Sequence, residues 1–212
     1  MSFVWDERAA AYRESGEHRE GPDLDLIVQW ADGAQTALDV ATGGGHVARR
    51  LREAGLEVVT SDAAPGMQPD VVCRAEDLPF AEASFDVVAS RLGAHHFADV
   101  TAALHEMARV ARDSVLLVDN VYAGEEWEEA DRIRDPSHVR KLSEDEWRTL
   151  FADAGLRVAE VRRLHRTIGV ERWLERTRCV GADAARVREL LADRIEGDTI
   201  RIERIALRGS KA

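Results

Sequence analysis

The sequence predicts an α/β fold, a single doubly wound domain with a mostly parallel sheet. Short apolar runs typical of buried strands alternate with stretches typical of helices over most of the 212 residues. The segments 36–41, 43–45, 46–55 and 56–62 read as strand, glycine turn, helix and strand, which is the pattern of a βαβ unit. The length corresponds to one domain with a sizeable core.

The elements up to residue 120 follow the same alternation. Pro65, Gly66 and Pro69 leave no room for a long helix after the second strand. The other elements expected in this part are helices over 3–16, 21–31 and 99–112 and strands over 70–75, 85–91 and 113–120.

Beyond residue 120 the pattern changes. Helices are expected over 124–134 and 143–154, the second with Ser143 as N-cap, and a further helical stretch near 170–195. The β-like segments 156–164 and 199–209 have little of a crossover pattern between them, so we expect a hairpin-like antiparallel pair at one sheet edge. The acidic run 125-EEWEEAD-131 is predicted to be a solvated helix face.

Composition excludes several classes of function. The formal charge of −11 argues against a broad nucleic-acid face, which would have to be basic. No apolar run approaches the roughly 18 residues of a membrane span, and the first residues lack a signal-peptide core, so we expect a cytoplasmic protein with no membrane partner. Cys73 and Cys179 lie far apart without a CxxC motif, which makes a disulfide or zinc framework improbable.

The glycine turn and a strand-end acid predict a cofactor that contains a nucleoside. In parallel sheets, ligands bind beyond the carboxyl ends of the strands, where glycines let a ligand approach the backbone closely. Asp62 ends the second strand, 19 residues after Gly43, and its carboxylate can accept hydrogen bonds from two ribose hydroxyls. Either feature alone would read as ordinary turn punctuation.

The same turn also fits the G-x-G-x-x-A pattern of an NAD(P)-dependent oxidoreductase. Asp39 argues against that class, because a dinucleotide site usually has only apolar residues in the strand before the turn. Neither Tyr12 nor Tyr122 is followed four positions on by lysine, and the length leaves no room for a second catalytic domain. The oxidoreductase stays as an alternative.

Several motifs resemble those of the class I S-adenosylmethionine-dependent methyltransferases, in the subgroup similar to the ubiquinone/menaquinone-type enzymes. They are LDVATGGGH, VVTSDAAPGM, AEDLPFAEASFDVVASRLGAHHFAD, EMARVARDSVLLVDN and RDPSHVRKLSEDEWRTLFADAGL, and the likeness runs from about residue 6 to 164. The resemblance implies a Rossmann-like sheet of seven strands in the order 3-2-1-4-5-7-6, with strand 7 antiparallel. It also implies methyl transfer from S-adenosylmethionine to a small molecule by in-line displacement.

The resemblance divides the single domain, 1–212, into three parts. Residues 1–31 would form an N-terminal helical cap, 36–120 the cofactor-binding core, and 121–212 the acceptor-side helices and terminal strands. Asp39 would hold the methionine end of the cofactor, Asp62 its ribose, and Arg91 would lie towards the methionine and the substrate. The residues at cofactor positions of the motifs are Asp39, Ala41, Gly43, Gly45, Asp62, Ala63, Met67, Ala75, Glu76 and Arg91.

Two departures from the family pattern concern the adenine side. The connection 63–74 is about a dozen residues shorter than usual, and Arg74 stands where an aspartate commonly accepts a hydrogen bond from adenine. A guanidinium cannot accept one. These departures leave open a second alternative, a non-catalytic methyltransferase-like protein with a shortened adenine pocket that binds a cofactor or a partner.

His95 and His96, which follow a strand end, are the candidate catalytic residues. Methyl transfer needs alignment and the exclusion of water, and a base only if the acceptor must lose a proton. A structural role for both histidines is the alternative. His105-Glu106 does not continue into a zinc motif, so no metal is expected. On the substrate side we expect Tyr12, Asn120, Arg134 and His138, around a small-molecule acceptor; the sequence does not indicate an oligomeric state.

Overall fold

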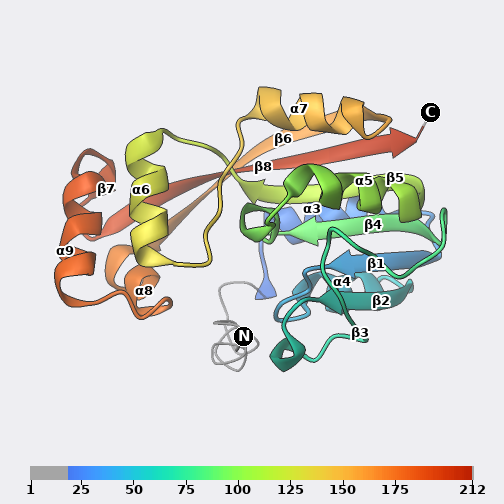
Figure 1. Cartoon of the computed structure of the whole chain (residues 1–212), viewed down its shortest axis with the longest axis horizontal. Coiled ribbons are helices and arrows are strands. Elements are labelled where there is room, and N and C mark those ends of the chain that lie inside the picture. Colours follow the sequence, from blue (N-terminus) through green and yellow to red (C-terminus); the bar gives the residue numbers. More distant parts are fainter. Residues whose placement is uncertain (1–18, 212) are drawn as a thin grey trace.

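The computed structural model describes residues 19–211, which form one mixed β-sheet with helices on both faces (Figure 1). The strand order is β3-β2-β1-β4-β5-β8-β6, and the short β7 pairs with β8 outside this path. Strands β3, β2, β1, β4 and β5 are mutually parallel, whereas β8 is antiparallel to both β5 and β6. The described residues form eight strands where seven were predicted, but the additional strand is the two-residue β7, which lies off the main order. Without β7, β8 takes the place of strand 7, and the predicted order 3-2-1-4-5-7-6 is confirmed.

The elements have the following bounds. The strands are β1 (Thr36–Val40), β2 (Glu57–Asp62), β3 (Val71–Val72), β4 (Phe85–Arg91), β5 (Ala111–Asn120), β6 (Leu156–Gly169), β7 (Ile195–Glu196) and β8 (Thr199–Lys211). The helices are α3 (Pro22–Trp30), α4 (His46–Glu53), α5 (Val100–Val110), α6 (Glu125–Arg134), α7 (Glu144–Asp153), α8 (Val170–Glu175) and α9 (Gly181–Leu190). Short 3₁₀ turns cover Pro65–Met67, Ala94–His96 and Ala192–Arg194.

Alternate residues of the central strands enter two separate apolar clusters. Leu38, Val88 and Leu117 pack under α5 and α7 on one face, whereas their neighbours Ala37 and Val87 pack under α3 and α4 on the other. Because both faces are covered, the central strands are apolar almost throughout. An acid inside such a strand therefore needs a specific partner, and β1 has one such acid.

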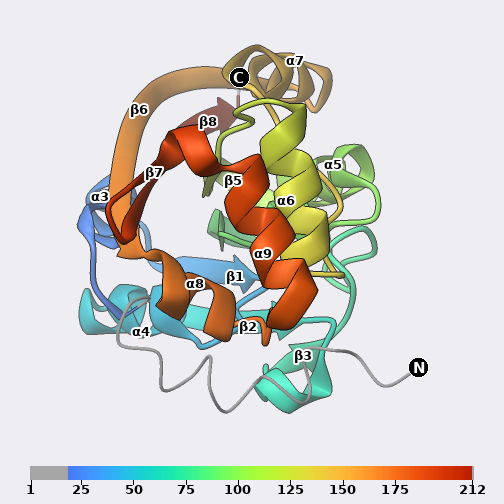
Figure 2. The ribbon, with the colours of Figure 1, turned by 90° about the vertical axis from the view of Figure 1, so that its left-hand side faces the viewer.

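A second unit sits beyond the carboxyl ends of the parallel strands. Strands β6 and β8, 14 and 13 residues long, continue past the sheet core and are connected through α8, α9 and β7. Helix α6, which follows β5, packs against α9, and we call α6, α8, α9 and β7 together the helical lobe (Figures 1 and 2). The lobe has its own apolar cluster, which includes Trp127, Trp173, Leu174 and Val187. The space between the lobe and the strand ends holds the site described below.

Several sequence expectations need correction. The stretch near 170–195 is two helices, because the chain turns at Arg178 and Gly181, both with positive φ. Strand β6 reaches Gly169 rather than 164, and the strand expected over 70–75 has only two residues. The helix expected over 3–16 lies outside the described residues.

The remaining expectations concern the connection 63–74, the cysteines and the helix lengths. That connection has only a three-residue 3₁₀ turn and β3, as the prolines predicted. Cys73 and Cys179 are both free thiols. Over residues 19–211, none of the helices combines the length and the apolar content that a membrane crossing requires.

Candidate functional site

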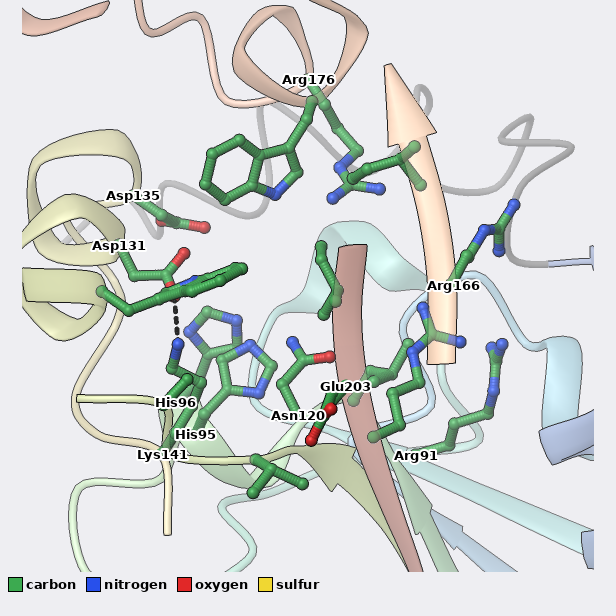
Figure 3. Close-up of a pocket in the computed structure, with 18 of the residues that line it drawn as sticks. Arg91, His95, His96, Asn120, Asp131, Asp135, Lys141, Arg166, Arg176 and Glu203 are labelled. Atoms are coloured by element: carbon green, nitrogen blue, oxygen red, sulfur yellow. Dashed lines mark ion pairs between the residues drawn. The ribbon is translucent and has the colours of Figure 1, made fainter. Parts of the chain in front are cut away.

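A cavity of about 490 Å³ opens at the carboxyl ends of β1, β4 and β5, beneath the helical lobe (Figure 3). The glycine turn after β1 and the ends of β4 and β5 form its floor, and residues of α6, β6, α8 and β8 form its upper walls. Strand β8 is antiparallel, so its beginning reaches the same edge, where Arg204 pairs with Asn120 of β5. The sheet topology thus brings residues from both ends of the chain to one space.

Asp39, the acid inside β1, braces the glycine turn. Its Oδ2 accepts hydrogen bonds from Thr42 Oγ1 at 2.6 Å and from the Ala48 amide at 3.1 Å, so one buried carboxylate joins the strand, the turn and α4. Burial raises the pKa of Asp39 to about 6, against the hydrogen bonds from Thr42 and Ala48, which lower it. The sequence did not identify Thr42; a hydroxyl three residues after the strand acid was the available signal.

The turn itself requires glycine. Gly43 and Gly45 have φ of 51° and 72°, in the left-handed region that glycine adopts at no steric cost. Asp62 at the end of β2 holds the turn from outside, accepting hydrogen bonds from the amides of Gly43 and Ala64 at 2.9 Å each. The carboxylate and the exposed turn backbone therefore lie side by side, as the cofactor hypothesis requires.

Most of the other residues at cofactor positions do not line the cavity. Ala41 and Arg91 line the cavity with Asp39 and Gly43, whereas Gly45, Asp62, Ala63, Met67, Ala75 and Glu76 do not. Met67 and Ala75 are buried, and Glu76 accepts hydrogen bonds from the amides of Ala98 and Asp99. Their adenosine-side roles stay predictions. Arg74 is exposed and pairs with Glu76 at 3.0 Å.

His95 is held by an acid that the sequence analysis did not single out. The fully buried Asp119, at the end of β5, contacts His95 Nδ1 through Oδ1 at 2.5 Å and accepts from the His95 amide through Oδ2 at 2.8 Å. Burial alone would raise the pKa of Asp119, but the charge and hydrogen bond of His95 hold it below its usual value. The signal available in the sequence was the acid directly before Asn120 at the end of a buried strand.

His96 is a neutral neighbour of this pair. Burial, together with the nearby charge of His95, lowers the pKa of His96 to about 3. Its Nδ1 lies 3.0 Å from the carbonyl oxygen of Ser137, so the neutral ring carries its proton on Nδ1 and donates it to that carbonyl. The ring centroids of His95 and His96 are 4.1 Å apart, and both residues line the cavity (Figure 3).

The predicted substrate-side residues divide into three groups. Asn120 and Arg134 line the cavity, the latter with its guanidinium 4.4 Å from the Trp173 ring centre. His138 does not: its side chain is 2% exposed and its Nε2 lies 3.0 Å from Glu128. His138 lies behind the α6 side of the cavity, where it is a hydrogen-bond partner for the buried carboxylate of Glu128. A buried carboxylate needs such a partner. Tyr12 lies outside the described residues.

The prediction that the acidic run is a solvated face is wrong for two of its members. Glu128 and Asp131 are buried, because Lys141 enters between them and places its Nζ at 2.7 Å from Asp131 and 3.4 Å from Glu128. Burial would raise the pKa of Asp131, but Lys141 and then Arg134 keep it well below its usual range. A paired carboxylate can be buried, and charge patterning alone could not reveal the partner.

Two buried arginines on the opposite side share one carboxylate. Asp23 Oδ2 accepts from Arg91 Nε at 2.7 Å and from Arg204 Nη1 at 2.8 Å. Burial lowers the pKa of Arg204 to about 10, with Asp23 opposing the shift and Arg91 and Arg166 adding to it. No pattern in the sequence indicated this group, since its members are up to 181 positions apart.

Comparison with known proteins agrees with this geometry. A family model described as a methyltransferase domain matches residues 38–118. The Bacillus subtilis protein YcgJ, named an uncharacterized methyltransferase, is 32% identical over 81% of this chain and 78% of its own length. Its solved structure has a TM-score of 0.80, with 26% identity, over 89% of this chain and 97% of that one. A demethylmenaquinone methyltransferase of Beutenbergia cavernae is 34% identical over 44% of this chain and 43% of its own. The chain therefore belongs to the class I methyltransferase family.

Proposed function

We propose that the protein transfers a methyl group from S-adenosylmethionine to a small-molecule acceptor. The observation that carries the proposal is that the glycine turn, braced by Asp39 and Asp62, opens into the same cavity as the His95–Asp119 pair. One side of the cavity then has the groups that suit the cofactor, and another has a base for the acceptor.

The residues present fit the cofactor. Gly43 and Gly45, with their left-handed backbone, place no side chain on the turn itself. Gly93 packs closely against the end of β1, where a Cβ on Gly93 would lie 2.8 Å from Ala41 Cβ. The Asp62 carboxylate suits the ribose hydroxyls, and the turn backbone suits the methionine end. When bound, S-adenosylmethionine supplies an electrophilic methyl group, which an acceptor takes while the electron pair of the carbon–sulfur bond stays on sulfur.

The contribution of the protein is to orient the acceptor and to move one proton. Asp119 occupies Nδ1 of His95, so Nε2 is the nitrogen on which His95 receives the acceptor's proton as the new bond to carbon forms. The resulting imidazolium lies against the Asp119 carboxylate, which stabilises it. His96 stays neutral and packs beside it, so of these two histidines only His95 is placed to act as the base.

The dimensions of the site favour a small acceptor. A cavity of about 490 Å³ lies within the range of small-molecule sites. Residues of the helical lobe form part of its walls, and the formal charge of −11 argues against a nucleic-acid substrate.

Calorimetry against S-adenosylmethionine, S-adenosylhomocysteine and NAD tests the proposal. We expect the first two to bind, and Asp62→Ala to weaken binding by roughly 1.5–3 kcal/mol because charge-assisted hydrogen bonds to the ribose are lost. Asp113→Ala, which removes an exposed acid on β5, is the control and should leave affinity unchanged. Binding of NAD alone would favour an oxidoreductase, and binding of none of the three would favour the non-catalytic alternative.

A further inference from the structure

One polar side chain on the cavity floor makes no hydrogen bond within the described part of the chain. Asn120, at the end of β5, is the only asparagine in the sequence, and it lines the cavity. What the fold uses is its main chain, which pairs with Arg204 of β8 and donates from its amide to Asp119. Any residue could supply those contacts, so the fold gives no reason for a carboxamide at this position.

The carboxamide lies beside the candidate base. Asp119 Oδ1 accepts from the Asn120 main-chain amide at 2.7 Å and contacts His95 Nδ1 at 2.5 Å, so one carboxylate oxygen holds both residues. Figure 3 shows the Asn120 side chain entering the cavity next to His95. Both residues are partly exposed, and both line this cavity. They therefore present their polar groups to the same part of the floor.

The two side chains offer opposite hydrogen-bonding roles. With Nδ1 engaged by Asp119, the neutral His95 ring has its acceptor at Nε2, which makes no hydrogen bond to residues 19–211. In the Asn120 carboxamide Oδ1 is buried, so the amide nitrogen, a donor, is the end that the cavity can reach. That nitrogen likewise has no partner among these residues. An atom that both donates and accepts suits the pair, and a hydroxyl oxygen is such an atom.

An oxygen nucleophile can use both contacts and still attack a methyl group. A hydroxyl that donates to His95 keeps two lone pairs, one for the N–H of Asn120 and one for the new bond. A neutral amine has a single lone pair, and a donor placed on it would compete with the attack. A thiol sulfur is only a weak hydrogen-bond acceptor. The arrangement therefore favours oxygen as the methylated atom.

We infer that Asn120 binds the oxygen of an acceptor hydroxyl that His95 deprotonates, so that the acceptor is an alcohol or a phenol and the product is a methyl ether. The inference rests on the proposed methyl transfer and names its substrate class. The hydroxyl proton moves to His95 Nε2, an oxygen lone pair forms the bond to the methyl carbon, and the electron pair of the carbon–sulfur bond stays on sulfur. As negative charge develops on the oxygen, the N–H of Asn120 binds it more strongly than it binds a neutral hydroxyl.

Charged groups near the floor also act on this oxygen, but they are the same in the wild type and in variants of Asn120. Asp119 is adjacent in the chain, Arg204 is the neighbour on β8, and Arg91 and Glu203 line the same cavity. A difference between the wild type and an Asn120 variant therefore reports on the carboxamide.

Titration with 4-nitrophenol tests the inference, because its phenolate absorbs visible light and the neutral phenol does not. The full-length protein is saturated with S-adenosylhomocysteine, so that no transfer occurs, and the absorbance of the bound probe is followed over a range of pH. We expect the bound phenol to have a lower pKa than the free phenol, and Asn120→Ala to raise the pKa of the bound phenol by about one unit, because a hydrogen bond to a charged oxygen is the stronger one. An equal pKa in the two proteins, or no bound nitrophenol in the wild type, would overturn the inference.

A matched ligand and matched variants separate hydrogen bonding from shape. 4-Nitroaniline has nearly the same size, with an amino group in place of the hydroxyl. Asn120→Ala should weaken binding of 4-nitrophenolate about tenfold and that of 4-nitroaniline less than about twofold. Asn120→Asp keeps the shape but has no N–H when ionised, and should lose at least as much. Equal losses for the two ligands would mean that Asn120 acts through shape alone and would overturn the inference.

The control variant is Gln29→Ala, which removes an exposed carboxamide of α3 that does not line the cavity. It should bind both ligands as the wild type does, and a loss equal to that of Asn120→Ala would overturn the inference. If Asn120→Asp does not fold, Asn120→Ala decides.

The two proposals can fail separately. S-adenosylhomocysteine binding is measured in its own calorimetric titration, without a phenol. A protein that binds S-adenosylhomocysteine but shows no dependence of nitrophenol ionisation on Asn120 would refute the inference alone. A protein that binds no S-adenosylhomocysteine would refute methyl transfer, and with it the assignment of the hydroxyl to a methyl acceptor. With S-adenosylmethionine and phenol, anisole is the expected product, and methylation of the ring carbon or no methylated phenol would overturn the assignment of oxygen.

Discussion

Replacing Asp23 by asparagine should destabilise the protein far more than replacing Asp25, two residues along the same helix. Asp23 is 2% exposed, and it lies 2.7 and 2.8 Å from the side chains of Arg91 and Arg204, which are 4% and 10% exposed. Asparagine keeps the shape but removes the negative charge that these two buried guanidinium groups share. Removing one partner of a buried ion pair typically costs 3–5 kcal/mol, so we expect a loss of about 3 kcal/mol or more.

Asp25→Asn is the matched control. Asp25 pairs with Arg50 at 2.6 Å, but its side chain is 67% exposed. An exposed pair contributes about 0–1 kcal/mol because solvent screens it. The contrast between the two variants therefore isolates burial, since both remove one carboxylate from α3.

Urea unfolding at pH 7 measures the loss in unfolding free energy for both variants. The dependence of that free energy on urea concentration, the m value, should be the same in wild type and variants. Burial opposes the shift, but Arg91 and Arg204 lower the pKa of Asp23, so its stabilising contribution is present above the unfolded pKa and is lost as pH falls through the folded one. The difference between wild type and Asp23→Asn should therefore shrink below about pH 4. A loss under about 1 kcal/mol at pH 7, or equal losses in the two variants, would refute the reasoning.

Three further predictions concern the site. Burial raises the pKa of Asp39 to about 6, so the contribution of its protonated form to stability is present below the unfolded pKa and is lost as pH rises through 6. Relative to Asp39→Asn, the free energy of unfolding of the wild type in urea should fall by up to about 3 kcal/mol between pH 4 and 7. Parallel curves of unfolding free energy against pH would contradict this. Gly93→Ala would place a Cβ 2.8 Å from Ala41 Cβ and should cost about 1–3 kcal/mol, whereas Gly169→Ala, with open space around it, should be nearly neutral by the same measurement. Asp119→Asn should lower the methyl-transfer rate by about 10²–10⁴ and leave S-adenosylhomocysteine affinity within about twofold; a parallel fall in both would indicate a merely structural role.

The fold could be predicted because its signals are local. The strand TALDV, the glycines that follow it and the acid at the end of the next strand lie within a few tens of residues, and each has one physical reason to be there. Ser143 as N-cap is a further case: its hydroxyl accepts from the Glu146 amide, and Glu146 bonds back to complete a capping box. Such short-range patterns carry over directly to the structure.

The unpredicted parts of the site depend on contacts between distant segments. The sharing of Asp23 by Arg91 and Arg204 joins an early helix to the last strand, and no periodicity in the sequence indicates it. The burial of Glu128 follows from the position of a single lysine, Lys141. His138 was expected on the substrate side of the cavity, but its side chain is buried against Glu128 of α6 and does not line the cavity.

The separate core of the helical lobe has a consequence for how the acceptor site can change. The apolar residues of α6, α8 and α9 pack mainly against one another and against the outer parts of β6 and β8, not against the clusters beneath α3, α4, α5 and α7. Substitutions at the lobe surface that faces the cavity, such as at Arg176, therefore alter one wall while the glycine turn and its two bracing acids keep their packing. Under the proposed function, acceptor choice and cofactor binding would thus be encoded in different parts of one chain, so that related proteins could diverge in the first while they retain the second.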